Sequence, residues 1–227
     1  MMARYFHDRS EAGRLLAEKL MAYANRKDIW VLALPRGGVP VAFEIAKALH
    51  APLDVFLVRK LGVPGHEELA MGAIASGGVV VHNDEVIGGL GISSQVIDTV
   101  VARERQELER REHLYRGDRP FPDLHGCTVI LVDDGLATGA SMRAAVVAIR
   151  QHQPAHTVIA VPIAAPDTCE ALSTQVDEII CAMTPDPMYS VGLWYEHFEQ
   201  TTDDEVRELL AQARSQLHRS RRVDGVQ

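Results

Sequence analysis

The sequence predicts an α/β protein with a parallel central sheet flanked by helices. Short apolar runs alternate along the chain with segments whose apolar residues recur at helical spacing, a pattern typical of parallel strands joined by crossover helices. Proline and glycines follow the first run, as expected where a strand turns into a helix. The runs that we assign to strands of this sheet are residues 29–34, 53–58, 129–132, 158–161 and 178–181.

Local signals define the elements of the first half of the chain. Apolar residues at helical spacing predict a helix from Arg4 to about Asn25, with Asp8 or Ser10 as its cap. The same spacing predicts a second helix over residues 41–49, which completes a βαβ unit with the strands on either side.

The middle of the chain departs from this alternation. Residues 62–78 are rich in glycine and proline, and we interpret them as a long mobile loop or a flexible hairpin. A short strand over residues 79–81 follows. The helix expected over residues 94–115 has many charges of both signs, which we interpret as a solvated face of the scaffold.

The second half continues the alternation and ends outside the sheet. Helices are expected over residues 141–150 and 167–175, and an irregular segment over 185–200 contains several aromatic residues. Thr202-x-x-Glu205 has the form of a capping box that opens a last helix. We expect a single domain with a core of about residues 29–181, a C-terminal hood and helix over about 182–217, and a frayed tail over 218–227.

Composition excludes several classes of protein. The chain has 227 residues, of which 47% are hydrophobic, enough for one sizeable core. Its 31 acidic and 23 basic residues give a net charge of −8, which argues against nucleic acid or an anionic membrane as partner. The three cysteines form no C-x-x-C pair, and no stretch resembles a signal peptide or a membrane span. We therefore expect a cytoplasmic protein.

Residues 129–142 carry the strongest chemical signal. An apolar run ends in Asp133 and Asp134, and a loop of small and hydroxyl residues then opens into a helix. Ligands of open α/β sheets bind beyond the carboxyl ends of the strands, where two carboxylates can accept hydrogen bonds from the hydroxyls of a ribose. The loop's backbone N–H groups, its hydroxyls and the helix N-terminus suit a phosphate. The segment can therefore hold a ribose 5-phosphate.

This segment resembles the phosphoribosyl-pyrophosphate signature of the type I phosphoribosyltransferases. The resemblance implies that Asp133 and Asp134 hold the ribose hydroxyls of phosphoribosyl pyrophosphate (PRPP), and that residues 137–141 bind its 5-phosphate. Residues 35–38 are similar to the family's pyrophosphate loop. The residues implied for PRPP binding are Pro35, Arg36, Gly37, Gly38, Arg59, Lys60, Asp133, Asp134, Ala137, Thr138, Gly139, Ala140 and Ser141.

The resemblance also implies how the reaction is catalysed. Arg59 and Lys60 follow the second expected strand, where members of the family keep basic residues for the diphosphate, and residues 59–62 are similar to adenine phosphoribosyltransferases. Mg²⁺ would arrive with PRPP and lie near the acidic pair, without direct protein ligands, and the protein would form a homodimer. The residues implied for catalysis are Asp133, Asp134, Arg36 and Lys60.

The acceptor is less well defined. Ala137 stands where hypoxanthine-type members carry an aspartate that assists the purine, which argues against hypoxanthine or guanine. Glu67 or Glu68 could place a carboxylate near the base or the diphosphate, although loop glutamates are most often solvent-exposed. Trp194 and Tyr195 lie where family members place a hood over the base, although aromatic residues near a chain end also fasten a terminal helix to the core.

Three functions remain open from the sequence. The resemblance implies transfer of the 5-phosphoribosyl group from PRPP to a nitrogen acceptor of the nucleobase class, with release of pyrophosphate. The first alternative is a PRPP-sensing regulatory or binding protein without turnover. The second is a hydrolase or phosphorylase that acts on a ribose phosphate. All three predict small-molecule ligands and neither a nucleic-acid nor a membrane partner.

Overall fold

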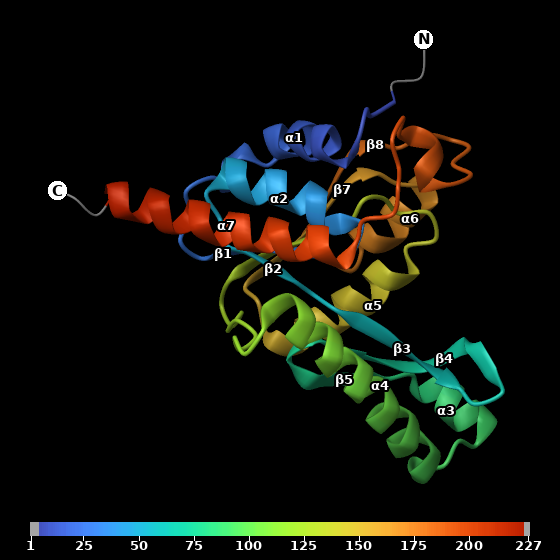
Figure 1. Cartoon of the computed structure of the whole chain (residues 1–227). Coiled ribbons are helices and arrows are strands. Elements are labelled where there is room, and N and C mark those ends of the chain that lie inside the picture. The colour runs from blue at the N-terminus through green and yellow to red at the C-terminus, as the bar shows by residue number, and fades with distance from the viewer. Residues whose placement is uncertain (1–4, 225–227) are drawn as a thin grey trace.

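The computed structural model describes residues 5–224 and confirms the α/β class (Figure 1). A five-stranded parallel sheet flanked by helices forms the body, and a three-stranded antiparallel sheet forms a smaller second part. Within the described residues, no helix is both long and apolar enough to cross a membrane.

The order of the parallel sheet is β2-β1-β6-β7-β8. From the centre, the chain proceeds outward in one direction from β1 to β2 and in the other from β6 to β8, so the order reverses between β1 and β6. Such a switch point leaves a crevice beyond the carboxyl ends of the two strands, where ligands of open α/β sheets bind. The strands are β1 (Ile29–Ala33), β2 (Leu53–Val55), β6 (Thr128–Val132), β7 (His156–Ile163) and β8 (Glu178–Met183).

Helices cover both faces of this sheet, because alternate residues of each buried strand point to opposite faces. One face packs against α1 (Arg9–Lys19) and α2 (Gly38–Leu49), and α7 (Asp203–Asp224) lies beside α2. The other face packs against α5 (Ala140–Ile149) and α6 (Pro166–Ser173). The sheet is therefore buried on both sides, and its carboxyl edge is the side open to a ligand.

The second part of the molecule is built on an antiparallel sheet of order β3-β4-β5. Figure 1 shows its hairpin pointing away from the parallel sheet, with α4 packed along β3 and β4. Its elements are β3 (Val58–Val63), β4 (His66–Ala75), β5 (Val79–His82), α3 (Asp84–Leu90) and α4 (Ser94–Arg116). Short 3-10 helices are η1 (Met21–Tyr23), η2 (Ser76–Gly78), η3 (Arg150–His152) and η4 (Val191–Trp194).

The strand expected over residues 53–58 was wrong in its second half. β2 ends at Val55, and Val58 already belongs to β3 of the other sheet. Phe56 and Leu57 between them are both buried, and their N–H groups donate to Ala33 O and Ser76 Oγ. The apolar run is continuous from β2 to β3, so the sequence gives no signal of the point where the chain passes from one sheet to the other.

Residues 62–78 were expected to form either a long mobile loop or a flexible hairpin, and they form a hairpin. The turn between β3 and β4 is short and contains Gly65, whose φ of +81° is the left-handed conformation that favours glycine. β4 continues to Ala75, η2 follows, and β5 confirms the short strand expected after it. The flexibility of this hairpin stays a prediction.

The two terminal helices differ from their expected bounds. α1 begins after Asp8, whose Oδ1 accepts the N–H of Glu11 at 2.7 Å, and ends at Lys19 rather than near residue 25. The capping box of α7 is confirmed by reciprocal hydrogen bonds between Thr202 and Glu205. α7 continues to Asp224, beyond the expected end near residue 217, because no proline or glycine interrupts the helix there. The fraying of the tail stays a prediction. Residues 225–227 lie outside the described residues.

Candidate functional site

Two adjacent carboxylates follow the central strand β6. The backbone N–H of Asp134 donates to Asp133 Oδ1 at 2.9 Å. Burial raises the pKa of Asp133 well above its usual range, and the neighbouring Asp134 raises it further. Burial also raises the pKa of Asp134, against the opposing effect of Arg9. A ligand that brings hydrogen-bond donors or positive charge would therefore offset the cost of holding this pair ionised.

The loop after β1, residues 35–38, lies against the acidic pair. A Cβ on Gly37 would lie 2.0 Å from Asp134 Oδ2, and one on Gly38 would lie 2.7 Å from a backbone carbonyl oxygen of β6. Any side chain at these two positions would push the loop away from the carboxylates. The close approach of the two loops therefore depends on glycine.

The expected phosphate loop connects the acidic pair to α5. Gly139 is the N-cap of α5 with a φ of +68°, and no side chain among the described residues caps this N-terminus. Thr168 Oγ1 donates to the carbonyl oxygen of Ala137 at 2.7 Å, and Arg143 donates to that of Thr138. These contacts turn the loop's carbonyl groups toward the protein, which leaves the first N–H groups of α5 for an anion.

The outer side of this loop is open to solvent. Thr138, Ala140 and Ser141 are exposed, and the last two form the first turn of α5. Apart from the Thr138 carbonyl oxygen, which accepts from Arg143, the exposed groups of these residues are accessible to a ligand from solvent. A phosphate at this helix end would replace water on these groups and meet the positive end of the helix dipole.

Arg9 joins the acidic pair to the C-terminal segment. Its Nε donates to Asp134 Oδ2 at 2.8 Å, and its Nη1 donates to the carbonyl oxygen of Glu199 at 2.8 Å. The guanidinium carbon lies 3.9 Å from the ring centroid of Phe198, and Tyr195 Oη donates to the carbonyl oxygen of Asp134 at 2.7 Å. Sequence reasoning missed Arg9, since a single arginine in the first turn of a helix carries no signal of its own.

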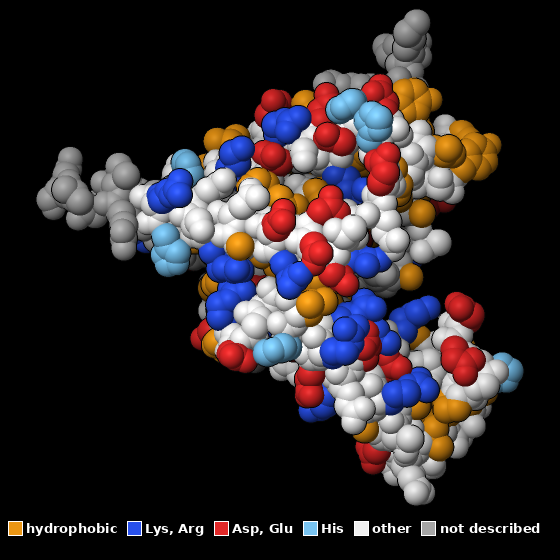
Figure 2. All heavy atoms as spheres, viewed as in Figure 1, with side chains coloured by type: hydrophobic (Ala, Val, Ile, Leu, Met, Phe, Trp, Pro, Cys, Tyr) orange, Lys and Arg blue, Asp and Glu red, His pale blue; other side chains and the backbone are white. Residues whose placement is uncertain are grey.

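A cavity of about 570 Å³ opens beside the acidic pair. Its wall contains four arginines and two aspartates, so it is positively charged although the whole chain is acidic. In Figure 2, Lys and Arg side chains gather in the hollow between the two parts of the molecule. The lining residues are Arg9, Pro35, Arg36, Gly37, Arg110, Arg111, Tyr115, Asp134, Val191, Phe198, Gln200, Thr201 and Asp203.

The contribution of α4 to this wall corrects the expectation of a merely solvated scaffold helix. Arg110 and Arg111 both bind Glu107 and lower its pKa to about 2, while their side chains reach the cavity. Tyr115 Oη donates to Asp203 Oδ1 at 2.5 Å, and burial raises the pKa of Tyr115 to about 12. Arg111 and Tyr115 lie four residues apart, and therefore on one helix face, which is the signal that could have marked them.

Comparison with known proteins decides the family. A sequence profile described as the phosphoribosyl transferase domain matches residues 7–187. The chain belongs to the phosphoribosyltransferase family. A candidate phosphoribosyl transferase of Mycobacterium tuberculosis, found in strains CDC 1551 and H37Rv, is 44% identical over 221 residues, which are 97% of this chain and 50% of that protein. The chain thus spans half the length of the curated relatives it matches.

A solved structure also resembles this chain over nearly its whole length. The crystal structure of the protein TT1426 from Thermus thermophilus has 41% sequence identity and a TM-score of 0.81. The match covers 92% of this chain and 98% of that chain. The arrangement of both sheets is therefore shared with a known protein.

Arg59 and Lys60, which were expected directly after the second strand of the parallel sheet, lie instead on the hairpin β3–β4. Arg59 Nη2 lies 2.5 Å from Glu104 Oε2, a buried carboxylate on α4. Lys60 Nζ lies 3.8 Å from Glu68 Oε2. The backbone N–H of Glu67 itself and that of Gly65, at 3.2 Å, lower the pKa of the Glu67 carboxylate. Among the described residues, none from this hairpin lines the cavity beside the acidic pair. Their roles toward PRPP and the acceptor stay predictions.

The aromatic residues of the hood divide between support and cavity. Tyr195 is buried and supports the backbone of Asp134, and Trp194 stacks on Tyr5 with ring centroids 5.8 Å apart. Phe198 stacks on Tyr195 and reaches the cavity wall. Of these three rings, Phe198 is the one among the described residues that line the cavity.

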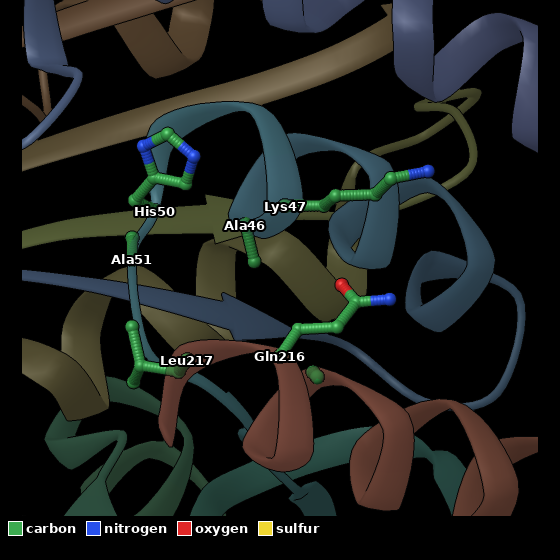
Figure 3. Close-up of a pocket in the computed structure, with 7 residues that line it drawn as sticks. Ala46, Lys47, His50, Ala51, Gln216 and Leu217 are labelled. Atoms are coloured by element: carbon green, nitrogen blue, oxygen red, sulfur yellow. The ribbon is translucent and has the colours of Figure 1, made fainter. Parts of the chain in front are cut away.

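A second hollow lies between α2 and α7 (Figure 3). Its wall has a lysine and a histidine, and no carboxylate is among its described lining residues, which are Ala46, Lys47, His50, Ala51, Ala213, Gln216 and Leu217. The hollow lies at the C-terminal half of α2 and beside the middle of α7, whereas the N-terminal end of α2 adjoins the loop after β1. It lacks the paired acceptors that a ribose needs.

Proposed function

We propose that this phosphoribosyltransferase transfers the 5-phosphoribosyl group of PRPP to a nitrogen acceptor of the nucleobase class and releases pyrophosphate. One observation supports the proposal most strongly. Asp133 and Asp134 lie at the topological switch point, between the glycine loop after β1 and the open N-terminus of α5. A sugar diol with a phosphate group on either side is the ligand that matches two carboxylates flanked by two anion sites.

PRPP would lie along the carboxyl edge of β1 and β6. Its 5-phosphate would accept hydrogen bonds from the first N–H groups of α5 and from the hydroxyls of Thr138 and Ser141. Its ribose hydroxyls would donate to the carboxylates of Asp133 and Asp134. These charged hydrogen bonds are stronger than those of water because the pair is largely enclosed by protein.

The diphosphate of PRPP would face residues 35–38 and the arginines of the cavity wall. Arg36 Nη1 lies 3.6 Å from Asp203 Oδ1, and the two side chains are 35% and 44% exposed. Ion pairs of this exposure contribute little free energy. Arg36 can therefore exchange Asp203 for a diphosphate oxygen, with Arg110 and Arg111 across the cavity adding positive charge.

The acidic pair also fits Mg²⁺ that arrives with PRPP. Mg²⁺ prefers oxygen ligands and commonly binds through one or two carboxylates together with substrate phosphates. Asp133 and Asp134 offer adjacent carboxylates, whereas the described residues contain no group of three or more His, Cys, Asp or Glu suited to a metal ion. When bound, the ion would supply positive charge to the leaving diphosphate.

The transfer breaks one bond at the anomeric carbon and forms another. The bond from this carbon to the diphosphate oxygen breaks, positive charge develops on the ribose, and a nitrogen lone pair of the acceptor forms the new bond from the opposite face. The proton on that nitrogen then leaves. The protein contributes position and charge: Arg36 stabilises the departing diphosphate, and Asp133 and Asp134 hold the ribose.

The acceptor would enter beneath the hood, beside Phe198, whose ring forms part of the cavity wall. Arg9 already covers part of this ring and holds Asp134, so the hood and the ribose site are mechanically linked. Ala137 supplies no carboxylate, which favours acceptors other than hypoxanthine and guanine.

The test is pyrophosphate release from Mg²⁺–PRPP with a panel of purine and pyrimidine bases and a control without base. Release that depends on one base is the expected result and identifies the acceptor. Calorimetry run in parallel measures PRPP binding. Binding without release by any base would contradict the transferase and support the PRPP-sensing alternative, and release without base would support a hydrolase.

A further inference from the structure

Two cysteines from different elements meet beside the phosphate loop. Cys169 lies in α6 and Cys181 in β8, and their sulfur atoms are 2.6 Å apart. We propose that Cys169 and Cys181 form a thiol–disulfide site, which peroxides or small disulfide oxidants convert to an intramolecular disulfide that fixes α6 against the phosphate loop. The proposed transferase activity does not require this bond, so the two proposals stand independently.

The surrounding fold favours the bond. α6 packs on β8, and both cysteines lie at the edge of the apolar cluster formed with α5, partly exposed rather than fully buried. A disulfide needs sulfur atoms about 2.05 Å apart, so the two side chains must approach only slightly further. Cys127, the third cysteine, makes its contact with the carbonyl oxygen of Asp123 instead. The pair is therefore specific.

Oxidation would proceed in two balanced steps. The thiolate of Cys169 attacks a peroxide oxygen, the O–O bond breaks, and hydroxide leaves, which gives a sulfenic acid. The sulfur of Cys181 then attacks the sulfur of Cys169, the S–O bond breaks, and the departing hydroxide takes the thiol proton. Two thiols and one hydrogen peroxide thus yield one disulfide and two waters. Burial and the adjacent Cys169 raise the pKa of the Cys181 thiol, which favours Cys169 as the first nucleophile.

The bond would act on the loop through the residue next to Cys169. Thr168 donates to the carbonyl oxygen of Ala137, and its methyl carbon lies 2.6 Å from where a Cβ on Gly139 would be. α6 therefore supports the loop that leads into α5. A disulfide from α6 to β8 would reduce the local opening of this support, and with it the hydrogen exchange of both segments.

The first experiment oxidises the full chain with hydrogen peroxide or oxidised glutathione and maps its cysteines by mass spectrometry. We expect a peptide that joins Cys169 to Cys181, one remaining free thiol, and the loss of two hydrogen atoms from the intact mass. The Cys127→Ser variant should form the same bond, whereas Cys169→Ser and Cys181→Ser should not. Three free thiols after oxidant treatment, or a bond that involves Cys127 or a second chain, would overturn the proposal.

The second experiment tests the mechanical link and needs no variant. Hydrogen exchange of oxidised and reduced wild-type chain is compared peptide by peptide. We expect exchange in α6 and residues 137–141 to slow by about threefold or more on oxidation, with the hairpin β3–β4 unchanged. Unchanged exchange in α6 and the loop would contradict the proposed support even if the disulfide forms.

Discussion

The loop after β6 and the hairpin β3–β4 both carry residues predicted to bind PRPP, but the fold places them very differently. The acidic pair at the start of the loop lies at the switch point, with Asp134 held by Arg9 and close to Gly37. The hairpin belongs to a separate sheet, where Arg59 binds Glu104 on α4. Both sets of residues were predicted to bind PRPP, but only those of the loop after β6 lie at the candidate site in the unliganded protein.

This difference separates two kinds of binding determinant. The loop takes its place from the parallel sheet, since Leu34 N–H donates to the carbonyl oxygen of Val132 at 2.8 Å and brings the two strand ends together. The hairpin takes its place from its own strand pairing and from α4. We expect substitutions in the loop to affect PRPP binding and substitutions in the hairpin to affect mainly stability.

The largest effect is expected for Gly37→Ala. The new methyl group would lie 2.0 Å from Asp134 Oδ2, so the carboxylate and the loop must separate. Displacement of reacting groups by about 1 Å can cost about 100-fold in rate. We expect a large loss of PRPP affinity as well, because the ribose and diphosphate sites move apart, measured by calorimetry with Mg²⁺. Gly88→Ala is the matched control, because nothing lies within 4 Å of a Cβ there. Equal PRPP affinity in Gly37→Ala and Gly88→Ala would contradict the claim that the loop after β1 positions the PRPP site.

Glu104→Gln tests the hairpin side through stability. This buried carboxylate binds Arg59 and also Arg103, whose Nε lies 3.0 Å from it. Loss of its charge should lower the free energy of unfolding by about 1–2 kcal/mol, measured by urea unfolding, and leave PRPP affinity within about twofold. Glu68→Gln, at a fully exposed position, should leave the urea midpoint essentially unchanged. A larger effect of Glu104→Gln on PRPP affinity than on stability would contradict this assignment.

Asp133→Asn should stabilise the unliganded protein while weakening PRPP binding. Burial and Asp134 raise the pKa of Asp133, and asparagine can still accept the N–H of Asp134 without the buried charge. We expect the free energy of unfolding at neutral pH to rise, because the variant no longer buries a carboxylate beside Asp134.

The advantage of Asp133→Asn over wild type should grow with pH. Between the pKa of an unfolded aspartate and the raised folded value, the folded wild-type protein binds more protons than the unfolded chain, so its stability falls as pH rises through that window. Urea unfolding of both proteins at a series of pH values upward from about pH 4, near the pKa of an unfolded aspartate, measures this change. A variant less stable than wild type at every pH would refute the account.

The smallest effect is expected for Lys60→Ala. Lys60 is exposed and pairs only weakly with Glu68, at 3.8 Å, away from the lining of the cavity. With the hairpin in this position, PRPP affinity should change by less than about twofold, as for other exposed ion pairs. A tenfold loss would show that the hairpin closes over the diphosphate when PRPP binds, and would restore the role that the resemblance implies for Lys60.

The site was predictable where local sequence determines the backbone. The apolar run of β6 has to end where the charged residues Asp133 and Asp134 begin. Gly139 then permits the left-handed turn into α5, so the position of this loop could be predicted from local sequence. The approach of residues 35–38 was also predictable, because the carboxyl ends of neighbouring parallel strands share one edge of the sheet.

Other parts of the fold and site depend on tertiary contacts that the sequence does not mark. Phe56 and Leu57 extend an apolar run across the boundary between two sheets, which moved Arg59 and Lys60 to a different place from that predicted. Arg9 gains its role only because α1 lies beside the C-terminal segment. A charge pattern alone could not distinguish a solvated face of α4 from a cavity wall.

The most direct test of the central claim is calorimetric titration of Mg²⁺–PRPP into wild-type protein, Asp134→Asn and Lys60→Ala. Asp134 accepts hydrogen bonds in the proposed complex, and loss of its charge should weaken binding by about 1–3 kcal/mol. We expect wild type and Lys60→Ala to bind PRPP with nearly equal affinity and Asp134→Asn to bind about tenfold or more weakly. Unchanged affinity in Asp134→Asn would contradict a ribose site at the end of β6.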